Sequence, residues 1–255
     1  MKKDKAKKPD TSLLLLCFGL LFMLIGASVF LYPKVSNALY EHRVTGELEV
    51  FEASRAERET EIPEEKTEEK PLTPLEELYL KLSGENLRLY EEHQNKLVDP
   101  WSYQQTAVDL TEYGVEDGII GYLSIEKMNV VLPILLGASE QNMLKGAVHM
   151  TQTSYPIGGE NTNCVLAAHR GYNKQDMFRN IHRLKIGDEV VLDNLWETLY
   201  YRVVEIQIVE PTEVDKVLIR EGRDLLTLLS CNPLGQHTER ILVFCERYTP
   251  ETTAS

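Results

Sequence analysis

Apolar and polar positions divide this chain into a long apolar run, a charged stretch and a region of short alternating runs. No charged residue occurs from Ser12 to Tyr32, a span of 21 residues. A helix needs about 20 apolar residues to cross the hydrocarbon core of a bilayer, so residues 12–32 are predicted to form a transmembrane signal-anchor. Charge is dense in the following residues 33–71, where large apolar side chains are few. We expect this segment to be an acidic stalk or linker that carries the rest of the chain away from the bilayer.

The charges that flank the apolar run predict its orientation. Residues 1–11 form a basic tail with five Lys, whereas Lys34 is the only cation soon after the run. The positive-inside rule therefore places the tail in the cytoplasm and the later residues outside, with a single pass through the cell membrane. A cleaved signal peptide is the alternative, but its apolar core is usually only about 7–15 residues long. No second apolar run of spanning length follows, and residues 249–255 are expected to be a polar tail.

Residues 72–117 show two helical patterns. Thr73 fits a helix N-cap, with Glu76 completing a capping box, and apolar side chains recur at helical spacing as far as Leu82. We expect this helix to end at Ser83 and Gly84, and a second helix to run from residue 85 to about residue 97. An Asp-Pro step then predicts a loop at residues 99–101.

Residues 118–248 have the pattern of a mainly β domain. Short runs of β-branched and apolar residues are separated by Gly, Asn and Asp, which is typical of a barrel or a sandwich. The predicted strands are Ile119–Ile125, Val130–Leu136, Cys164–Ala168, Glu189–Asp193, Thr198–Val209, Leu225–Ser230 and Arg240–Cys245. Two short helices are expected around Glu140–Lys145 and Gln175–Leu184.

Composition excludes several classes of protein. Hydrophobic residues make up 43% of the chain, which is enough for a core, so a wholly disordered protein is excluded. The 40 acidic and 27 basic residues leave a net charge of −13, which argues against nucleic-acid binding. The four cysteines include no Cys-x-x-Cys pair, and the acidic residues form no calcium loop, so no metal or other cofactor is expected.

Three residues at strand ends are candidates for chemistry. Cys231 follows an apolar strand and precedes a turn, a position that exposes a nucleophile on a rigid element, whereas Cys164 and Cys245 lie within strands and suit a core. His169 also ends a predicted strand. Arg240 opens the strand after the turn, so a hairpin could bring it beside Cys231. Taken singly, each could instead be structural: a buried or disulfide-bonded Cys231, a core His169 and a solvated Arg240.

The residues around these positions resemble the sortase family. Thr227 to Cys231 is similar to the TLxTC signature, with Ser230 where Thr is usual. Cys231 to Val243 resembles the CxPxGxxxxRLLV pattern of class C, pilin-polymerising sortases, with Glu239 at a less usual position. His169 in Ala-Ala-His-Arg-Gly and the motif Asp99-Pro100-Trp101 fit the same class. The resemblance implies a closed eight-stranded β-barrel with short helices, preceded by a helical lid region and the transmembrane helix.

The resemblance also implies an activity and its residues. His169, Cys231 and Arg240 would be the catalytic residues of a cysteine transpeptidase that cleaves an LPxTG-like sorting signal. The partners would be secreted pilin subunits, joined through a lysine amine. Asp99 and Trp101 would belong to a lid over the site, although Trp101 could be an ordinary packing residue. Two alternatives stay open: transfer of surface proteins to a cell-wall precursor, and a membrane-tethered binding module without enzymatic activity.

Overall fold

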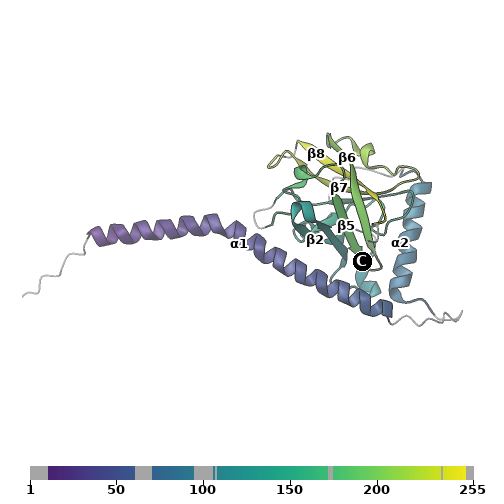
Figure 1. Ribbon diagram of the computed structural model, residues 1–255, viewed down its shortest axis with the longest axis horizontal. Coiled ribbons are helices and arrows are strands. Elements are labelled where there is room, and N and C mark those ends of the chain that lie inside the picture. Colours follow the sequence, from purple (N-terminus) through teal and green to yellow (C-terminus); the bar gives the residue numbers. More distant parts are fainter. Residues whose placement is uncertain are drawn as a thin grey trace, which may run out of the picture.

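The computed structural model describes residues 11–60, 71–94, 106, 108–171, 175–236 and 238–250. Its centre is a closed barrel in the order β1-β2-β3-β4-β7-β8-β6-β5. Figure 1 shows the barrel with α1 and α2 beside it. The strands are β1 (Ile119–Ile125), β2 (Val130–Leu136), β3 (Ala147–His149), β4 (Thr162–Ala167), β5 (Glu189–Asn194), β6 (Thr198–Val209), β7 (Asp224–Asn232) and β8 (Glu239–Arg247). The predicted closed eight-stranded barrel is therefore confirmed.

Side chains alternate between two faces of the central strands and build two apolar clusters. Leu226 and Leu228 of β7 point into the barrel and join the main core, whereas Leu229 belongs to a second cluster on the outer face. Leu229 lies opposite Ala167 of β4 and Leu242 of β8, which are in the same outer cluster. This period of two is what the apolar runs predict for strands with apolar side chains on both faces.

The connections between strands are short helices and turns. They include α3 (Glu140–Met143) and the 3₁₀ turns η1 (Leu110–Tyr113), η2 (Glu126–Met128), η3 (Ile181–Arg183) and η4 (Val214–Val217). The prediction of a helix across residues 175–184 is wrong. Arg179 and Ile181 donate their N–H groups to the carbonyls three residues earlier, so this segment forms successive turns that reduce to η3. Strand β3 was missed because three residues are too few to show a period.

Helix α2 (Pro74–Glu91) is one helix where two were expected. Its capping box is present, since Thr73 Oγ1 accepts from the Glu76 N–H and the Glu76 carboxylate accepts from the Thr73 N–H. The helix continues through Ser83 and Gly84, because its buried side chains repeat every four residues on both sides of that pair. The last of them, Asn86, is held by the backbone N–H of Tyr155 at 2.7 Å. Burial of this face outweighs the glycine's cost of about 1 kcal/mol.

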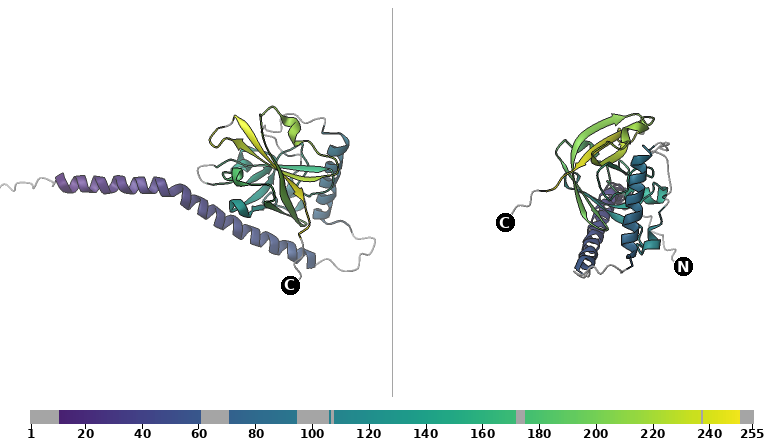
Figure 2. Two further views of the ribbon diagram at one scale, coloured as in Figure 1. Left: turned by 45° about the horizontal axis from the view of Figure 1, so that its top comes forward. Right: turned by 90° about the vertical axis from the view of Figure 1, so that its right-hand side faces the viewer.

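Helix α1 (Thr11–Thr60) is continuous through the predicted membrane segment and the acidic segment. Leu15–Arg58 is the one helix in the described part of the chain that is long and apolar enough to cross a membrane, by length and composition. Its first half extends away from the barrel, and its second half runs along it, while α2 stands against the side of the barrel (Figures 1 and 2).

The acidic segment was expected to stand away from the barrel, but its helix lies against it. Tyr40 and Val44 are buried in the main core, and Leu48 and Phe51 pack against it. These four positions form one helical stripe with spacings of four, four and three residues, which the density of charge hid from the sequence analysis. Within the predicted acidic stalk or linker of residues 33–71, the part that belongs to α1 therefore packs on the barrel through this stripe.

Polar contacts reinforce this docking at several points along α1. The Tyr40 hydroxyl donates to the Lys145 carbonyl at 2.7 Å. Near the C-terminal end of α1, the Arg55 guanidinium donates to the Asn194 carbonyl at 3.1 Å and to the Thr198 hydroxyl at 2.8 Å. It also pairs at 3.4 Å with Asp193, whose side chain is only 7% exposed. A buried carboxylate needs such partners, so Arg55 joins α1 to β5 and β6.

Candidate active site

Cys231 lies where β7 leaves the barrel. Its side chain shares the outer face with Leu229, two residues earlier, because side chains alternate along a strand. Cys231 is partly exposed and its thiol is not in a disulfide. Cys164 and Cys245 are fully buried, and burial raises the pKa of both thiols, which keeps them protonated. Of the three cysteines beyond the apolar run, Cys231 alone is placed to meet a substrate.

Arg240 is the direct cross-strand neighbour of Cys231. The hairpin between β7 and β8 pairs Cys231 with Arg240 and Leu229 with Leu242. Directly opposed residues of an antiparallel pair have Cβ atoms about 4.5–5.5 Å apart and point to the same face. The expectation that the turn brings Arg240 back beside Cys231 is confirmed in this register. One strand thus carries the thiol, and the adjacent strand a cation on the same face.

His169 reaches the same region from β4, on the other side of β7. The parallel β4–β7 ladder pairs Ala167 with Leu229. It continues beyond the strand, since the Ala168 N–H donates to the Leu229 carbonyl at 3.2 Å. The buried Ser230 hydroxyl donates to the Ala168 carbonyl at 2.8 Å. The register therefore carries His169 to the level of Cys231, two residues past the Ala167–Leu229 pair.

The other described histidines lie elsewhere. His42, His93 and His182 are exposed on α1, at the end of α2 and on η3. His149 is buried in the barrel, stacked on Tyr155 with ring centroids 4.8 Å apart. Burial lowers the pKa of His149 to about 4, so its imidazole is neutral at pH 7. His237 lies outside the described residues. Among the described histidines, His169 is the one brought to Cys231.

Arg170 contacts the backbone of Cys231, which the sequence analysis did not anticipate. Its Nη1 donates to the Cys231 carbonyl at 3.2 Å and to Oδ1 of Asn232. Asn232 Nδ2 in turn donates to Glu239 Oε2 at 2.8 Å. These contacts link the end of β4, the end of β7 and the start of β8. The signal that could have suggested them is an arginine directly after a histidine at a strand end.

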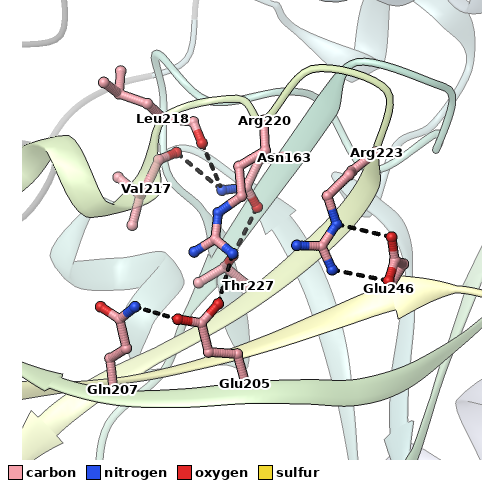
Figure 3. A network of polar contacts seen from close by, with 9 residues as sticks. All are labelled: Asn163, Glu205, Gln207, Val217, Leu218, Arg220, Arg223, Thr227 and Glu246. Carbon is pink, nitrogen blue, oxygen red and sulfur yellow. Dashed lines mark hydrogen bonds and ion pairs between the residues drawn. The ribbon is translucent and has the colours of Figure 1, made fainter.

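The connection between β6 and β7 covers the outer cluster below Cys231. Val217 of η4 is fully buried there with Leu229 and Leu242. Asn163, near the start of β4, holds this connection by donating to the Val217 carbonyl at 3.0 Å (Figure 3). Thr227 of β7 orients Asn163 by donating to its Oδ1 at 2.7 Å. The covering segment is thus bonded to the same two strands that present His169 and Cys231.

Two ion pairs hold the base of this connection. Arg220 pairs with Glu205 at 2.6 Å, and its guanidinium lies 4.3 Å from the centre of the Phe244 ring. Arg223 makes two bonds of 2.8 Å to Glu246, as Figure 3 shows. The bonds from these arginines hold the pKa of Glu205 and of Glu246 below the usual range. The connection therefore has a charged, well-bonded base beside its apolar underside.

A cavity of about 740 Å³ lies away from these residues. Its walls come from residues 106–118 and from residues 135–145, around the end of β2 and helix α3. None of His169, Cys231 and Arg240 lines it. Within the described ranges, no group of three His, Cys, Asp or Glu side chains could hold a metal ion. The lid candidates Asp99 and Trp101 lie outside the described residues.

The barrel thus brings together a partly exposed thiol, a cation on the same sheet face and a histidine at the adjacent strand end. A family model of the sortase domain matches residues 123–248. Sortase A of Bacillus anthracis is 29% identical over 158 residues, which are 60% of this chain and 72% of that protein. Sortase D of Bacillus subtilis is 29% identical over 132 residues, which are 51% of this chain and 64% of that protein.

Solved structures give the same result over more of the chain. Sortase C1 of GBS pilus island 1 is 25% identical, with a TM-score of 0.67 over 81% of this chain and 98% of that one. Sortase C-1 from Actinomyces oris is 32% identical, with a TM-score of 0.56 over 66% of this chain and 99% of that one. The chain belongs to the sortase family, whose members are cysteine transpeptidases, and its structural neighbours are mainly class C pilin sortases.

Proposed function

We propose that this chain is a membrane-anchored transpeptidase that joins secreted pilin subunits through isopeptide bonds. The observation that carries the proposal is the convergence of three strand ends: Cys231 and Arg240 form a cross-strand pair, and the β4 register brings His169 level with them. A thiol, a proton carrier and a cation are the groups that acyl transfer from a peptide requires. The likeness to pilin sortases supports pilin as the substrate.

In the first step, the Cys231 thiolate attacks the carbonyl carbon of the threonine in an LPxTG-like sorting signal. A carbon–sulfur bond forms, and the Thr–Gly carbon–nitrogen bond breaks. His169 gives its proton to the departing amine of the C-terminal fragment. Arg240, on the same sheet face, stabilises the negative charge on the substrate oxygen. The product is a thioester between the substrate and Cys231.

In the second step, a lysine amine of another pilin subunit attacks the thioester carbonyl. His169 takes a proton from that amine, the carbon–sulfur bond breaks, and the thiolate is restored. The new amide is an isopeptide bond, so the reaction exchanges one amide for another without an external energy source. Protonation of His169 before the first step and after the second closes the cycle.

Asp99 and Trp101 are proposed to form a lid over this site. An indole over the thiol would exclude water and lower the apparent affinity for the sorting signal by the fraction of time the lid is closed. Trp101→Ala is then expected to raise hydrolysis of a sorting-signal peptide. Unchanged or slower hydrolysis would count against the lid.

Helix α1 supports anchoring of the enzyme to the cell membrane, with the basic N-terminal tail in the cytoplasm and the barrel outside. Its apolar half is fully exposed in the described structure, which suits a lipid environment. Substrates that are also held in the membrane after export would meet the barrel there.

The proposal is tested with the purified full chain in detergent and a peptide that carries a candidate sorting signal. Mass spectrometry should find the peptide's N-terminal fragment attached to Cys231, and Cys231→Ala should abolish the adduct. Cys17→Ser, which changes a cysteine in the apolar run, is the matched control and should leave the adduct intact. A Cys231→Ala variant that still processes the peptide would refute the proposed nucleophile, whereas a wild-type chain that binds the peptide but neither forms the adduct nor cleaves it would favour a binding module.

The acceptor is tested separately. With purified pilin alone, the enzyme should produce a covalent ladder of pilin on a denaturing gel. Transfer only to a cell-wall peptide amine, without a ladder, would assign the chain to surface-protein anchoring instead.

A further inference from the structure

Arg170 reaches the candidate nucleophile from the β4 side, opposite to Arg240 on β8. A single nitrogen, Nη1, donates both to the Cys231 carbonyl and to the Asn232 side chain. Asn232 passes the contact to Glu239, the cross-strand partner that precedes Arg240. The end of β7 is therefore held from both sides just where its ladder finishes. A strand end without such contacts frays, because its last residues have few partners.

The charge of Arg170 interacts with the Cys231 side chain, in addition to the hydrogen bond that Arg170 donates to the Cys231 backbone. Partial burial lowers the pKa of the Arg170 guanidinium, and negative charge on Cys231 acts in the opposite direction. The side chain is nevertheless cationic, since a guanidinium does not lose its proton in proteins. Its Nε is buried with no hydrogen-bond partner among the described residues. Holding a desolvated cation here costs free energy, which packing alone does not explain.

We propose that Arg170 is a positioning residue for the nucleophile, which fixes the backbone from which the Cys231 thiol projects toward His169 and Arg240. The inference rests on the proposed function in so far as Cys231 is the nucleophile. It assigns Arg170 no contact with the substrate. Displacement of a reacting group by about 1 Å can reduce turnover about 100-fold, so a residue that holds this backbone controls the rate.

The structure offers a matched control in Arg179. This arginine lies in the same β4–β5 connection, but it pairs with Asp176 at 2.8 Å and is 41% exposed. Arg179→Met thus removes the same side chain without touching Cys231 or Asn232. Arg170→Lys keeps a cationic nitrogen that can donate to both acceptors, whereas Arg170→Gln keeps a donor without the charge.

The first experiment measures sorting-peptide turnover by the full chain in detergent. Arg170→Met is expected to lower kcat about 10- to 100-fold with KM changed by less than about twofold, because ground-state binding is intact. Arg170→Lys should retain more turnover than Arg170→Gln. A kcat for Arg170→Met within twofold of that for Arg179→Met overturns the inference. If Arg170→Met does not fold, the comparison of Arg170→Lys with Arg170→Gln tests the inference instead. Equal turnover by these two variants overturns the positioning role of Arg170.

The second experiment needs no substrate. Alkylation of Cys231 by iodoacetamide at pH 7, followed by mass spectrometry of the Cys231 peptide, should be at least about threefold slower in Arg170→Met than in Arg179→Met. Equal alkylation rates overturn the inference. If the two variants differ in alkylation rate but the wild-type chain processes no peptide, the proposed function is refuted, while the influence of Arg170 on Cys231 through its backbone contact remains supported.

Discussion

The two ends of strand β7 differ in how their polar groups are held. At its start, Asp224 accepts from the Tyr201 hydroxyl at 3.0 Å and from the Gly159 N–H at 2.9 Å. At its end, Cys231 is partly exposed, and the contacts that hold it come from Arg170. The two side chains are seven residues, or roughly 23 Å, apart along the same strand. One end stabilises the barrel and the other presents a reactive group.

A single strand can both stabilise the barrel and present a thiol, because the hydrogen bonds at its two ends involve different residues. Burial raises the pKa of Asp224, and the bonds from Gly159 and Tyr201 oppose that shift. This carboxyl group accepts hydrogen bonds from neutral donors. The Cys231 end combines cations, a partly exposed thiol and a turn, which suits chemistry more than stability. Variants at one end should therefore leave the property of the other unchanged.

The largest effect is expected from Cys231→Ala. Turnover of a sorting-signal peptide should fall by at least about 10⁴-fold, since covalent catalysis then lacks its nucleophile. The melting temperature should change by less than about 2 °C, because the side chain is partly exposed. Kinetics and thermal unfolding of the same preparation check both. A large loss of stability would break the separation between the two ends of β7.

His149, level with the middle of β7, predicts how the barrel responds to pH. Its pKa is lowered to about 4 from an ordinary 6.5, so the unfolded chain binds the proton first as the pH falls. The free energy of unfolding should therefore be constant above about pH 6.5 and decline by up to about 3 kcal/mol toward pH 4. Urea unfolding at pH 7 and pH 4.5 measures this decline, and His149→Gln should show less of it. If the free energy of unfolding falls equally with pH in the wild-type protein and in His149→Gln, the decline does not come from His149.

Asp224→Ala is expected to destabilise the barrel without slowing chemistry. Removal of the carboxyl group leaves the Tyr201 hydroxyl and the Gly159 N–H without their acceptor, which costs about 2 kcal/mol. Chemical denaturation should show this loss, while kcat at a temperature where the variant is folded should stay within about twofold of wild type. Tyr201→Phe removes one of the two donors and should cost less. A kcat loss comparable to that of Arg170→Met would show that the two ends are coupled.

The smallest effect is expected at α2, which touches neither end of β7. Thr73→Ala removes the N-cap and should cost about 1 kcal/mol. Thr73→Ser keeps the hydroxyl and serves as the control. Equal unfolding free energies for the two variants would show that the cap contributes nothing measurable. Peptide turnover should be unchanged in both.

Sequence patterns located the strands well, because apolar runs of five or more residues bounded by Gly, Asn or Asp have few other structures open to them. They placed Cys231 and Arg240 in one hairpin, since a separation of nine positions leaves few other arrangements. The contact of Arg170 with Cys231, 61 positions away, could not be predicted, because it depends on the parallel β4–β7 register. The docking of α1 was missed for a similar reason. Tyr40 and Val44 are buried by the barrel surface, and the local sequence of α1 does not show which residues of the barrel will cover them.

Because α1 is continuous, the rotation of its helix fixes how the barrel is oriented relative to the apolar half, which is the candidate membrane span. Each residue of an α-helix adds about 100° of rotation and 1.5 Å of rise. One residue inserted between Tyr32 and the docking residue Tyr40 would turn the barrel by that angle relative to the apolar half of α1. Four inserted residues would nearly restore the facing while raising the barrel by about 6 Å. The number of residues between Tyr32 and Tyr40 thus sets the direction in which Cys231 faces relative to the apolar half of α1.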